Sequence, residues 1–322
     1  MIRKHDCLNN ITDPIWNRHL VLALGIPQLL ITFISAVFNS GVVLGVVFSK
    51  DFHKPIFILF CNLAVSDFLC SSSGFWIATL FITDPQSTVV GSKELLRAYA
   101  FHTMSVLATI YNLVVIGIER YLAVSGSLRL RCRITRNQIL STTLGIWVCA
   151  FSLGFMPLMG WNCLEKDKIS ALYSPLCMDY LTFITIPHCL VVLVLPLFTY
   201  SNIILFLRKH KGSMENLGQC HATYRLAEVQ VARTSVLIWV LALVSYAPFF
   251  AGVVFDSATQ QCPSKHSRAI YIFRNLTAMM ITINSLGDPI IYSLNMKKLG
   301  HRFRCLKLPS HNRIEVQAIG RT

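Results

Sequence analysis

The sequence predicts an all-α membrane protein, a seven-transmembrane-helix bundle with an extracellular N-terminus and a short amphipathic helix after the seventh span. Three observations lead to this fold class. Of the 322 residues, 54% are hydrophobic and 14% are charged, whereas about 25% of the residues of a soluble domain are charged. Seven apolar runs reach the roughly 20 residues that a membrane helix needs. Basic residues concentrate in alternate loops between these runs.

The seven runs follow one another with short connections, so consecutive helices should pack antiparallel. The expected spans are Leu20 to Phe48, Pro55 to Ile82, Glu94 to Ala123, Gln138 to Gly160, Leu181 to Leu207, Val229 to Asp256 and Ala269 to Leu294. Thr135 precedes the fourth run and is typical of a helix start. We therefore divide the chain into an extracellular N-terminus (1–19), a transmembrane domain (20–294) and an amphipathic helix with a cytoplasmic tail (295–322).

The placement of charge sets the orientation. One set of loops carries most of the lysines and arginines, whereas the other set mixes basic and acidic residues. The positive-inside rule therefore predicts a multi-pass plasma-membrane protein with its N-terminus outside and its C-terminus in the cytoplasm. The glycosylation sequon at Asn10 agrees with this orientation. The net charge of +14 does not indicate a nucleic-acid partner, because the basic residues lie between apolar runs.

Cysteine positions agree with an exported outer face. Four of the eleven cysteines, Cys7, Cys163, Cys177 and Cys262, are expected outside, where disulfides persist. Cys163 with Cys177 is the favoured pair, because the two share one loop and its closure costs the least entropy. Cys7 with Cys262 is then the second pair. Cys305 lies in the basic stretch after the last span, where it is either a palmitoylation site or an unmodified thiol.

A charged triplet, Glu119-Arg120-Tyr121, ends the third apolar run. Charged side chains at the end of a membrane span are costly in lipid, so they tend to face the protein interior and to carry a function. The alternative is that Arg120 only extends to the lipid head groups and helps to set the topology.

Polar residues inside the apolar runs must find partners within the bundle, because lipid offers none. These residues are Asn39, Asp67, Thr109, Asn284, Ser285 and Asp288. They form either a hydrated cavity that could hold a small cation such as Na⁺, or a hydrogen-bonded core without an ion. Pro196, Pro248 and Pro289 interrupt three spans, which favours either hinges for a two-state motion or static kinks.

Five motifs, in this order, resemble those of the rhodopsin-like (class A) G-protein-coupled receptors. They are the first-helix asparagine (Asn39), the second-helix LAxxD pattern (Leu63 to Asp67), a variant of the third-helix (D/E)RY motif (Glu119 to Tyr121), the fourth-helix tryptophan (Trp147) and the D-variant of NPxxY (Asp288 to Tyr292). The resemblance covers nearly the whole chain. Each motif alone is weak, but five at matching depths are specific.

Within this class, the sequence resembles the cluster of lysophospholipid, cannabinoid, adenosine and melanocortin receptors. Phe52 to Pro55 and Pro157 to Cys163 carry this likeness. Two positions depart from the class pattern. Tyr246 stands where the sixth helix usually has tryptophan, and Ile204 stands where the fifth helix usually has tyrosine.

The resemblance implies a receptor that converts binding of an extracellular small molecule, such as an anionic lipid-like ligand, into activation of a heterotrimeric G protein, with arrestin as a further partner. The implied coupling and switch residues are Glu119, Arg120, Tyr121, Glu228, Tyr246, Pro248, Asp288, Pro289 and Tyr292. At rest Arg120 should pair with Glu119 and with Glu228. The alternative for Glu228 is a solvated acid at a helix start.

A ligand pocket is expected in the outer thirds of the third, sixth and seventh spans. Its candidate residues are Arg97, Phe101, His102, Tyr246, Phe249, Phe250 and Arg274. A cationic rim above an aromatic pocket suits an anionic amphiphile whose phosphate or carboxylate pairs with Arg97 or Arg274. Alternatively, the two arginines are interfacial anchors and His102 is a buried polar group.

The sequence supports other functions less well. An odorant-type chemosensory receptor, or an atypical or decoy receptor with weak G-protein coupling, is compatible with the unusual Tyr246. A membrane transporter would more often show repeated halves and paired broken helices, which are not evident. An enzyme would need a metal or nucleophile cluster, and the sequence has none with suitable spacing. No cofactor other than Na⁺ is therefore expected.

Overall fold

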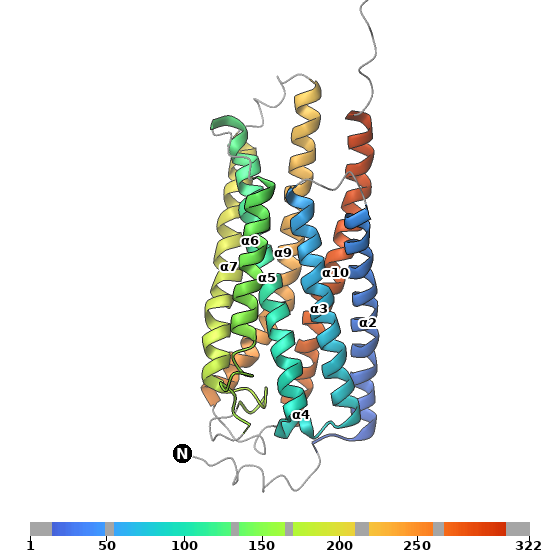
Figure 1. Cartoon of the computed structure of the whole chain (residues 1–322), viewed down its shortest axis with the longest axis vertical. Coiled ribbons are helices and arrows are strands. Elements are labelled where there is room, and N and C mark those ends of the chain that lie inside the picture. Colours follow the sequence, from blue (N-terminus) through green and yellow to red (C-terminus); the bar gives the residue numbers. More distant parts are fainter. Residues whose placement is uncertain are drawn as a thin grey trace, which may run out of the picture.

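The computed structural model describes residues 15–48, 55–129, 135–164, 170–209, 219–259 and 267–306. Seven long helices run side by side through these residues (Figure 1). They are α2 (Arg18–Phe48), α3 (Pro55–Thr83), α5 (Lys93–Arg129), α6 (Arg136–Gly154), α7 (Met178–Lys209), α9 (Gln219–Thr259) and α10 (Arg268–Leu306). A short helix, α4 (Ser87–Val90), lies between α3 and α5. The predicted seven-helix bundle is confirmed.

Four helices in the described part of the chain are long and apolar enough to cross a membrane by length and composition alone. They are Arg18–Phe48, Ile56–Thr83, Lys93–Leu122 and Ala232–Thr259. In α7, the apolar stretch Met178–Val192 is shorter than these four helices. In α6, the first turn contains Arg136, Asn137 and Gln138, which lower the mean hydropathy of the helix.

The start of α6 follows from a capping box. The Thr135 hydroxyl accepts a hydrogen bond from the Gln138 backbone N–H at 3.3 Å, and the Gln138 side-chain oxygen accepts one from the Thr135 N–H at 2.8 Å. These bonds satisfy two donors that a helix start otherwise leaves unpaired. The end of α6 differs from the prediction, since the helix stops at Gly154 and not at Gly160. Pro157 disfavours helical backbone in the residue before it, which accounts for the turn that follows.

The C-terminal end of the described chain also differs from the prediction. A separate amphipathic helix was expected after the seventh span, but α10 continues as one helix to Leu306. Between Pro289 and Leu306 the sequence contains no further proline, and Lys297, Lys298 and Leu299 are good helix formers. Nothing in this stretch therefore forces the helix to end.

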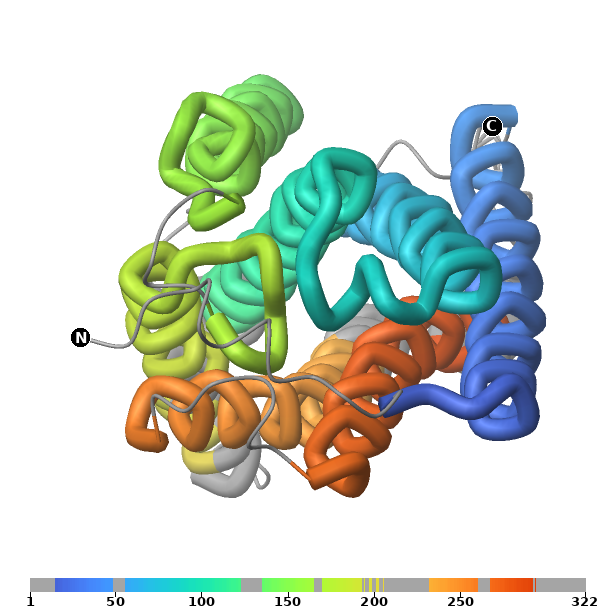
Figure 2. Tube along the Cα trace, turned by 90° about the horizontal axis from the view of Figure 1, so that it is seen from below, coloured from blue at the N-terminus to red at the C-terminus, as the bar shows by residue number. Residues whose placement is uncertain are grey.

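Each helix of the bundle packs against its neighbours, and α5 contacts four of them. This helix packs against α3, α6, α7 and α9, while α2 packs against α3 and α10, and α9 against α10. Figure 2 looks along the bundle and shows α6 at its periphery. Helices α5 and α6 cross closely at Gly154, where an added Cβ would lie 2.6 Å from the backbone of Met104. Glycine is required at this crossing because a side chain would push the helices apart.

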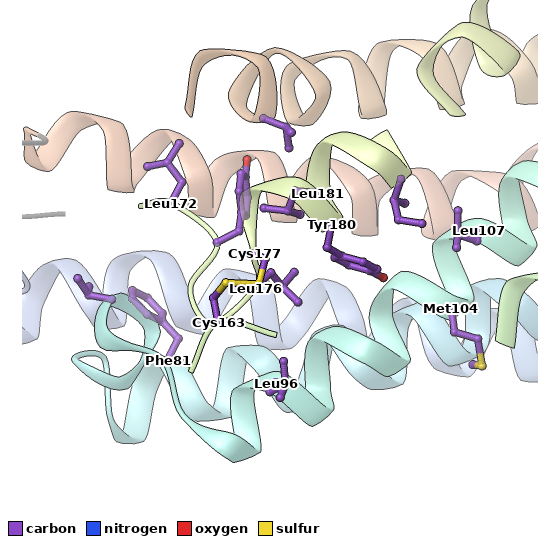
Figure 3. Close-up of a cluster of buried hydrophobic side chains, with 14 of the residues drawn as sticks. Phe81, Leu96, Met104, Leu107, Cys163, Leu172, Leu176, Cys177, Tyr180 and Leu181 are labelled. Atoms are coloured by element: carbon purple, nitrogen blue, oxygen red, sulfur yellow. A yellow bond between two sulfur atoms is a disulfide. The ribbon is translucent and has the colours of Figure 1, made fainter. Parts of the chain in front are cut away.

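Two apolar clusters fill the bundle. One lies among α3, α5, α7 and α9 around Leu63, Ile110 and Ile238. The other lies near the start of α2 and the loop between α6 and α7, and it includes Phe81, Leu107 and Tyr180 (Figure 3). The second cluster surrounds the candidate ligand site.

Candidate functional site

The charged triplet at the end of the third span is buried. Arg120 is 3% exposed and Glu119 is 8% exposed. The Arg120 guanidinium donates to both Glu119 oxygens, from Nε at 2.5 Å and from Nη2 at 2.6 Å. Tyr121 is half-buried and packs against a small cluster on α9 formed by Ala232 and Trp239. Arg120 thus faces the bundle interior, contrary to the alternative in which it only extends to the head groups.

Polar side chains of α2, α3 and α5 form a connected network at mid-bundle. The Asn39 amide donates to the backbone carbonyls of Ser35 at 3.0 Å and Ser285 at 2.8 Å, which ties α2 to α10. The Thr109 hydroxyl on α5 contacts the α3 side chains of Ser66 at 3.0 Å and Asp67 at 3.1 Å. The network therefore joins four of the six predicted core residues across four helices.

The same region contains buried polar atoms that make no hydrogen bond within the described part of the chain. Asp67, Asn284, Ser285 and Asp288 are 0% exposed. The unpaired atoms are one oxygen of Asp67, both oxygens of Asp288, the Ser285 hydroxyl and both polar atoms of the Asn284 amide. The carboxyl groups of Asp67 and Asp288 are close enough to interact electrostatically. Two buried carboxyl groups with spare oxygens require a cation, a proton or water.

A second polar link joins α3, α5 and α6. The Asn62 amide donates to Asn112 at 2.6 Å, and its oxygen accepts from the Trp147 indole N–H at 2.8 Å. Trp147 was expected from its motif, whereas Asn62 and Asn112 were not singled out. Their signal was an asparagine inside each of two apolar runs.

Aromatic residues connect the middle of α9 to its outer third. Tyr246 is fully buried, and its ring lies 6.3 Å from that of Phe250, which lies 6.1 Å from that of Phe249. Pro248 is inside α9 and Pro289 is inside α10, so both helices lack one backbone hydrogen bond near the core. The proline inside α9 and the aromatic residues beside it are the features that a hinge motion of α9 would need.

The loop between α6 and α7 carries the predicted disulfide. Cys163 and Cys177 are bonded, with their Cα atoms 5.0 Å apart (Figure 3). The Cys163 N–H donates to the Pro175 carbonyl, and the Ser170 N–H donates to the Leu176 carbonyl, so the loop folds back on itself. We refer to residues 170–177 as the outer-loop segment.

A cavity of about 90 Å³ is lined in part by the outer-loop segment. Its walls come from α2, α3, α4, α5, α7, α9, α10 and the loop. The lining residues are Gln28, Gly74, Ile77, Phe81, Thr88, Tyr99, His102, Thr103, Tyr173, Leu176, Leu181, Phe249, Arg274, Asn275, Thr277, Ala278 and Ile281. Three of the predicted pocket residues, His102, Phe249 and Arg274, are among them. Most of the lining is apolar or aromatic, as in small-molecule sites generally.

Arg274 is the cationic side chain of this cavity, and it is 5% exposed. Its Nη1 atom donates to the carbonyls of Thr88 at 2.7 Å and Leu172 at 3.1 Å, and Nη2 donates to the Thr88 hydroxyl at 3.1 Å. The guanidinium lies 5.6 Å from the centre of the Tyr271 ring. His102, on the opposite wall, has Nδ1 3.1 Å from the Ser73 hydroxyl. A buried guanidinium beside a cavity can bind an anion if it exchanges a neutral acceptor for a charged one.

Two predicted pocket residues lie elsewhere. The Arg97 side chain is 56% exposed and pairs with Glu94 on its own helix at 2.5 Å, so it does not line the cavity. Phe101 is 41% exposed and packs edge-on against Phe155 of the turn after α6. Both residues occupy the outward face of α5. Tyr246 and Phe250 of α9 are buried and do not line the cavity either.

Comparison with known proteins decides the family. Residues 38–292 match the family model of the 7 transmembrane receptor (rhodopsin family), which is most of the chain. The chain belongs to the rhodopsin family of seven-transmembrane receptors. The expected resemblance to class A G-protein-coupled receptors is therefore confirmed.

Several curated relatives are lysophosphatidic acid receptors by name. The receptor is 28% identical over 296 residues to lysophosphatidic acid receptor 1-B of Xenopus laevis, covering 91% of this chain and 77% of that one. It is 25% identical to lysophosphatidic acid receptor 2 of Mus musculus, covering 94% and 86%. It is 27% identical to lysophosphatidic acid receptor 1 of Homo sapiens, covering 90% and 77%. As a member of the rhodopsin family, the receptor is a multi-pass plasma-membrane protein that signals through G proteins, and it is not an enzyme.

Among solved structures, squid rhodopsin has the same fold. It matches with a TM-score of 0.71 at 17% sequence identity, covering 91% of this chain and 89% of that one. At this identity the likeness concerns the helix bundle alone. Within the described residues, no three His, Cys, Asp or Glu side chains gather as metal ligands would.

Several predicted site residues fall outside the described part of the receptor. The side chains of Glu228, Tyr292 and Cys305 are in this group, as are Asn10, Cys7 and Cys262. The lock between Arg120 and Glu228, the glycosylation site, the palmitoylation site and the second disulfide stay predictions.

Proposed function

We propose that the receptor responds to an anionic, lipid-like ligand whose phosphate or carboxylate binds at Arg274 in the outer cavity. One observation carries this proposal: Arg274 is a buried cation that lines a largely apolar and aromatic cavity. Charge-assisted hydrogen bonds from a guanidinium fit a phosphate or carboxylate well. Several curated relatives are lysophosphatidic acid receptors by name, and this supports the same ligand class here.

The size of the cavity limits how such a ligand can bind. A volume of about 90 Å³ suits a small polar head group, whereas drug-sized ligands occupy about 300–1,000 Å³. An acyl chain therefore requires the outer-loop segment or the helices around it to move. In the described conformation, the cavity has no room for an acyl chain.

The route from this cavity to the cytoplasm runs along α9. Phe249 lines the cavity, Phe250 contacts Tyr246, and Pro248 lies between them. A ligand shifts α9 only if it binds one of two conformations better than the other. Arg120, now bound to Glu119, is the contact that an outward-moved α9 would make available to a G protein. Arrestin would bind at the same cytoplasmic face.

The proposal includes a cation bound in the polar core. The unpaired oxygens of Asp67 and Asp288, together with Asn284 and Ser285, fit a Na⁺ ion with oxygen ligands or a small cluster of water. An ion there would neutralise the two carboxylates and favour the closed packing of α3 against α10. These residues would hold the cation, and outward movement of the helices would release it.

A ligand panel tests the proposed class. Cells that express the receptor would receive single-chain lipids with a phosphate head group, and monoacylglycerols with the same acyl chain as the neutral control. Dissociation of G-protein subunits would be measured for each Gα class. We expect activation by the phosphate lipids and not by the monoacylglycerols. Equal responses to both series, or activation by neutral ligands alone, would exclude an anionic head group as the recognised element.

The unusual residue Tyr246 supports one alternative. A receptor without the sixth-helix tryptophan could bind its ligand and couple weakly, as a decoy receptor or an odorant-type chemosensory receptor would. Saturable ligand binding without G-protein activation for any Gα class would favour this alternative.

A further inference from the structure

The outer-loop segment is buried along its whole length. Every residue from 170 to 177 is shielded from solvent, although connecting loops normally lie on the surface. Tyr173 and Leu176 line the cavity, and burial raises the pKa of the Tyr173 phenol. The segment thus fills the space through which a ligand would enter from the outside.

Two charged side chains on different helices hold this segment at Leu172. The Asp256 carboxylate on α9 accepts hydrogen bonds from the Leu172 N–H at 3.3 Å and from the Ser170 hydroxyl at 2.6 Å. Arg274 on α10 donates to the Leu172 carbonyl at 3.1 Å. Asp256 is 1% exposed. Buried charges of this kind depend on their hydrogen-bond partners, so the contacts are strong and costly to break.

The walls around the segment are shaped to receive it. An added Cβ at Gly252 of α9 would lie 2.7 Å from the Tyr173 hydroxyl, and one at Gly91 would lie 2.5 Å from the Ser174 hydroxyl. Gly91 also has a φ of 90°, which side chains other than glycine rarely adopt. On the α4 side, the Ser174 hydroxyl donates to the Val90 carbonyl at 2.9 Å. The outer-loop segment is therefore tightly packed between α9 and the end of α4.

We propose that Asp256 and Arg274 form a latch that seats residues 170–177 as an intramolecular plug in the mouth of the cavity, and that this latch opens before a ligand enters. The latch bridges α9 and α10, so a change in their separation strains both of its contacts. An anionic head group would compete with the Leu172 carbonyl for Arg274, because a charged acceptor binds a guanidinium more strongly than a neutral one. This last step rests on the proposed ligand class, whereas the plug itself does not.

The test measures access to the cavity without any ligand. A cysteine is introduced at Ala278, which lines the cavity on α10. The full-length receptor in lipid nanodiscs is then treated with a water-soluble, cationic methanethiosulfonate reagent. The receptor without the added cysteine gives the background from its native thiols. We expect slow labelling of Cys at this position in the parent, and labelling about tenfold faster in Asp256→Ala, because loss of a buried charged partner favours local opening. Asp179→Ala, which removes an exposed carboxylate at the start of α7, should leave the rate unchanged.

A milder variant keeps the test decisive if Asp256→Ala does not reach the membrane. Ser170→Ala removes the hydrogen bond from the Ser170 hydroxyl to Asp256, keeps that from the Leu172 N–H, and should give an intermediate rate. Unchanged labelling in every latch variant that folds would overturn the proposal. Faster labelling together with a failed lipid panel would instead support the latch and reject the ligand class.

Discussion

The Tyr173 hydroxyl of the outer loop occupies the space that a side chain at Gly252 of α9 would need, with 2.7 Å between the oxygen and the position of a Cβ. The Tyr173 ring also packs edge-on against Phe249, at 5.3 Å between centroids. Besides its contacts with Asp256, the outer loop therefore touches α9 at Phe249 and at Gly252, one helical turn apart. A substitution at Phe249 or at Gly252 should therefore alter the packing of both the loop and α9.

Gly252→Ala should destabilise the receptor because the new methyl group displaces Tyr173. Overpacking of this kind costs about 1–3 kcal/mol and should lower the melting temperature of the purified receptor by roughly 3–10 °C. Tyr173→Phe in the same chain removes the conflicting hydroxyl and should restore most of the loss. Gly145→Ala is the matched control, since no atom lies within 4 Å of its Cβ position. Equal effects of the two glycine substitutions would refute a tight fit at Gly252.

Na⁺ should stabilise the receptor through Asp67 and Asp288. Replacement of choline chloride by sodium chloride at constant ionic strength should raise the melting temperature of the parent receptor, since a ligand that binds only the folded state stabilises it. In Asp288→Asn this increase should disappear, because the carboxylate with two unpaired oxygens is lost. Asp179→Asn should keep it. A sodium effect that survives in Asp67→Asn and Asp288→Asn would place the ion elsewhere.

Asn62→Ala should weaken the contact between α3, α5 and α6. The substitution leaves the Trp147 indole N–H and the Asn112 side-chain oxygen without their buried partner, which costs about 1–3 kcal/mol. Thermal unfolding of the purified receptor measures this loss. Ser152→Ala, on the exposed face of α6, serves as the comparison and should have little effect. If Trp147→Phe were as stable as the parent, the indole contact would not be part of the stabilising link.

The sequence predicts the bundle because membrane helices leave a strong one-dimensional signal. Apolar runs of sufficient length, and the asymmetry of basic loops, identify each helix before its partners are known. The pair Cys163 and Cys177 was predictable for a related reason, since it depends on a short separation in the chain. Helix ends were less predictable, and α10 continues through a stretch that composition alone assigned to a separate helix.

The site was less predictable because it depends on which way each helix faces. Arg97 and Arg274 look alike in the sequence, as arginines near the outer end of an apolar run. In the structure Arg97 turns to the surface, whereas Arg274 turns into the cavity and binds the outer loop. Asp256 was noted only as the end of a span, because its partners at Ser170 and Leu172 lie more than eighty residues away. Local sequence patterns do not reveal contacts between residues so far apart in the chain.

The most direct measurement compares these two arginines in G-protein activation by a single-chain phosphate lipid. Arg274→Ala should raise the half-maximal lipid concentration by about 10- to 100-fold, the value of a charge-assisted hydrogen-bond pair. Arg274→Lys should fall between this variant and the parent, and Arg97→Ala should respond as the parent does, since Arg97 is exposed and away from the cavity. Surface expression would be matched for all four receptors. A normal response of Arg274→Ala, or a loss confined to Arg97→Ala, would contradict the assignment of the cavity at Arg274 as the ligand site.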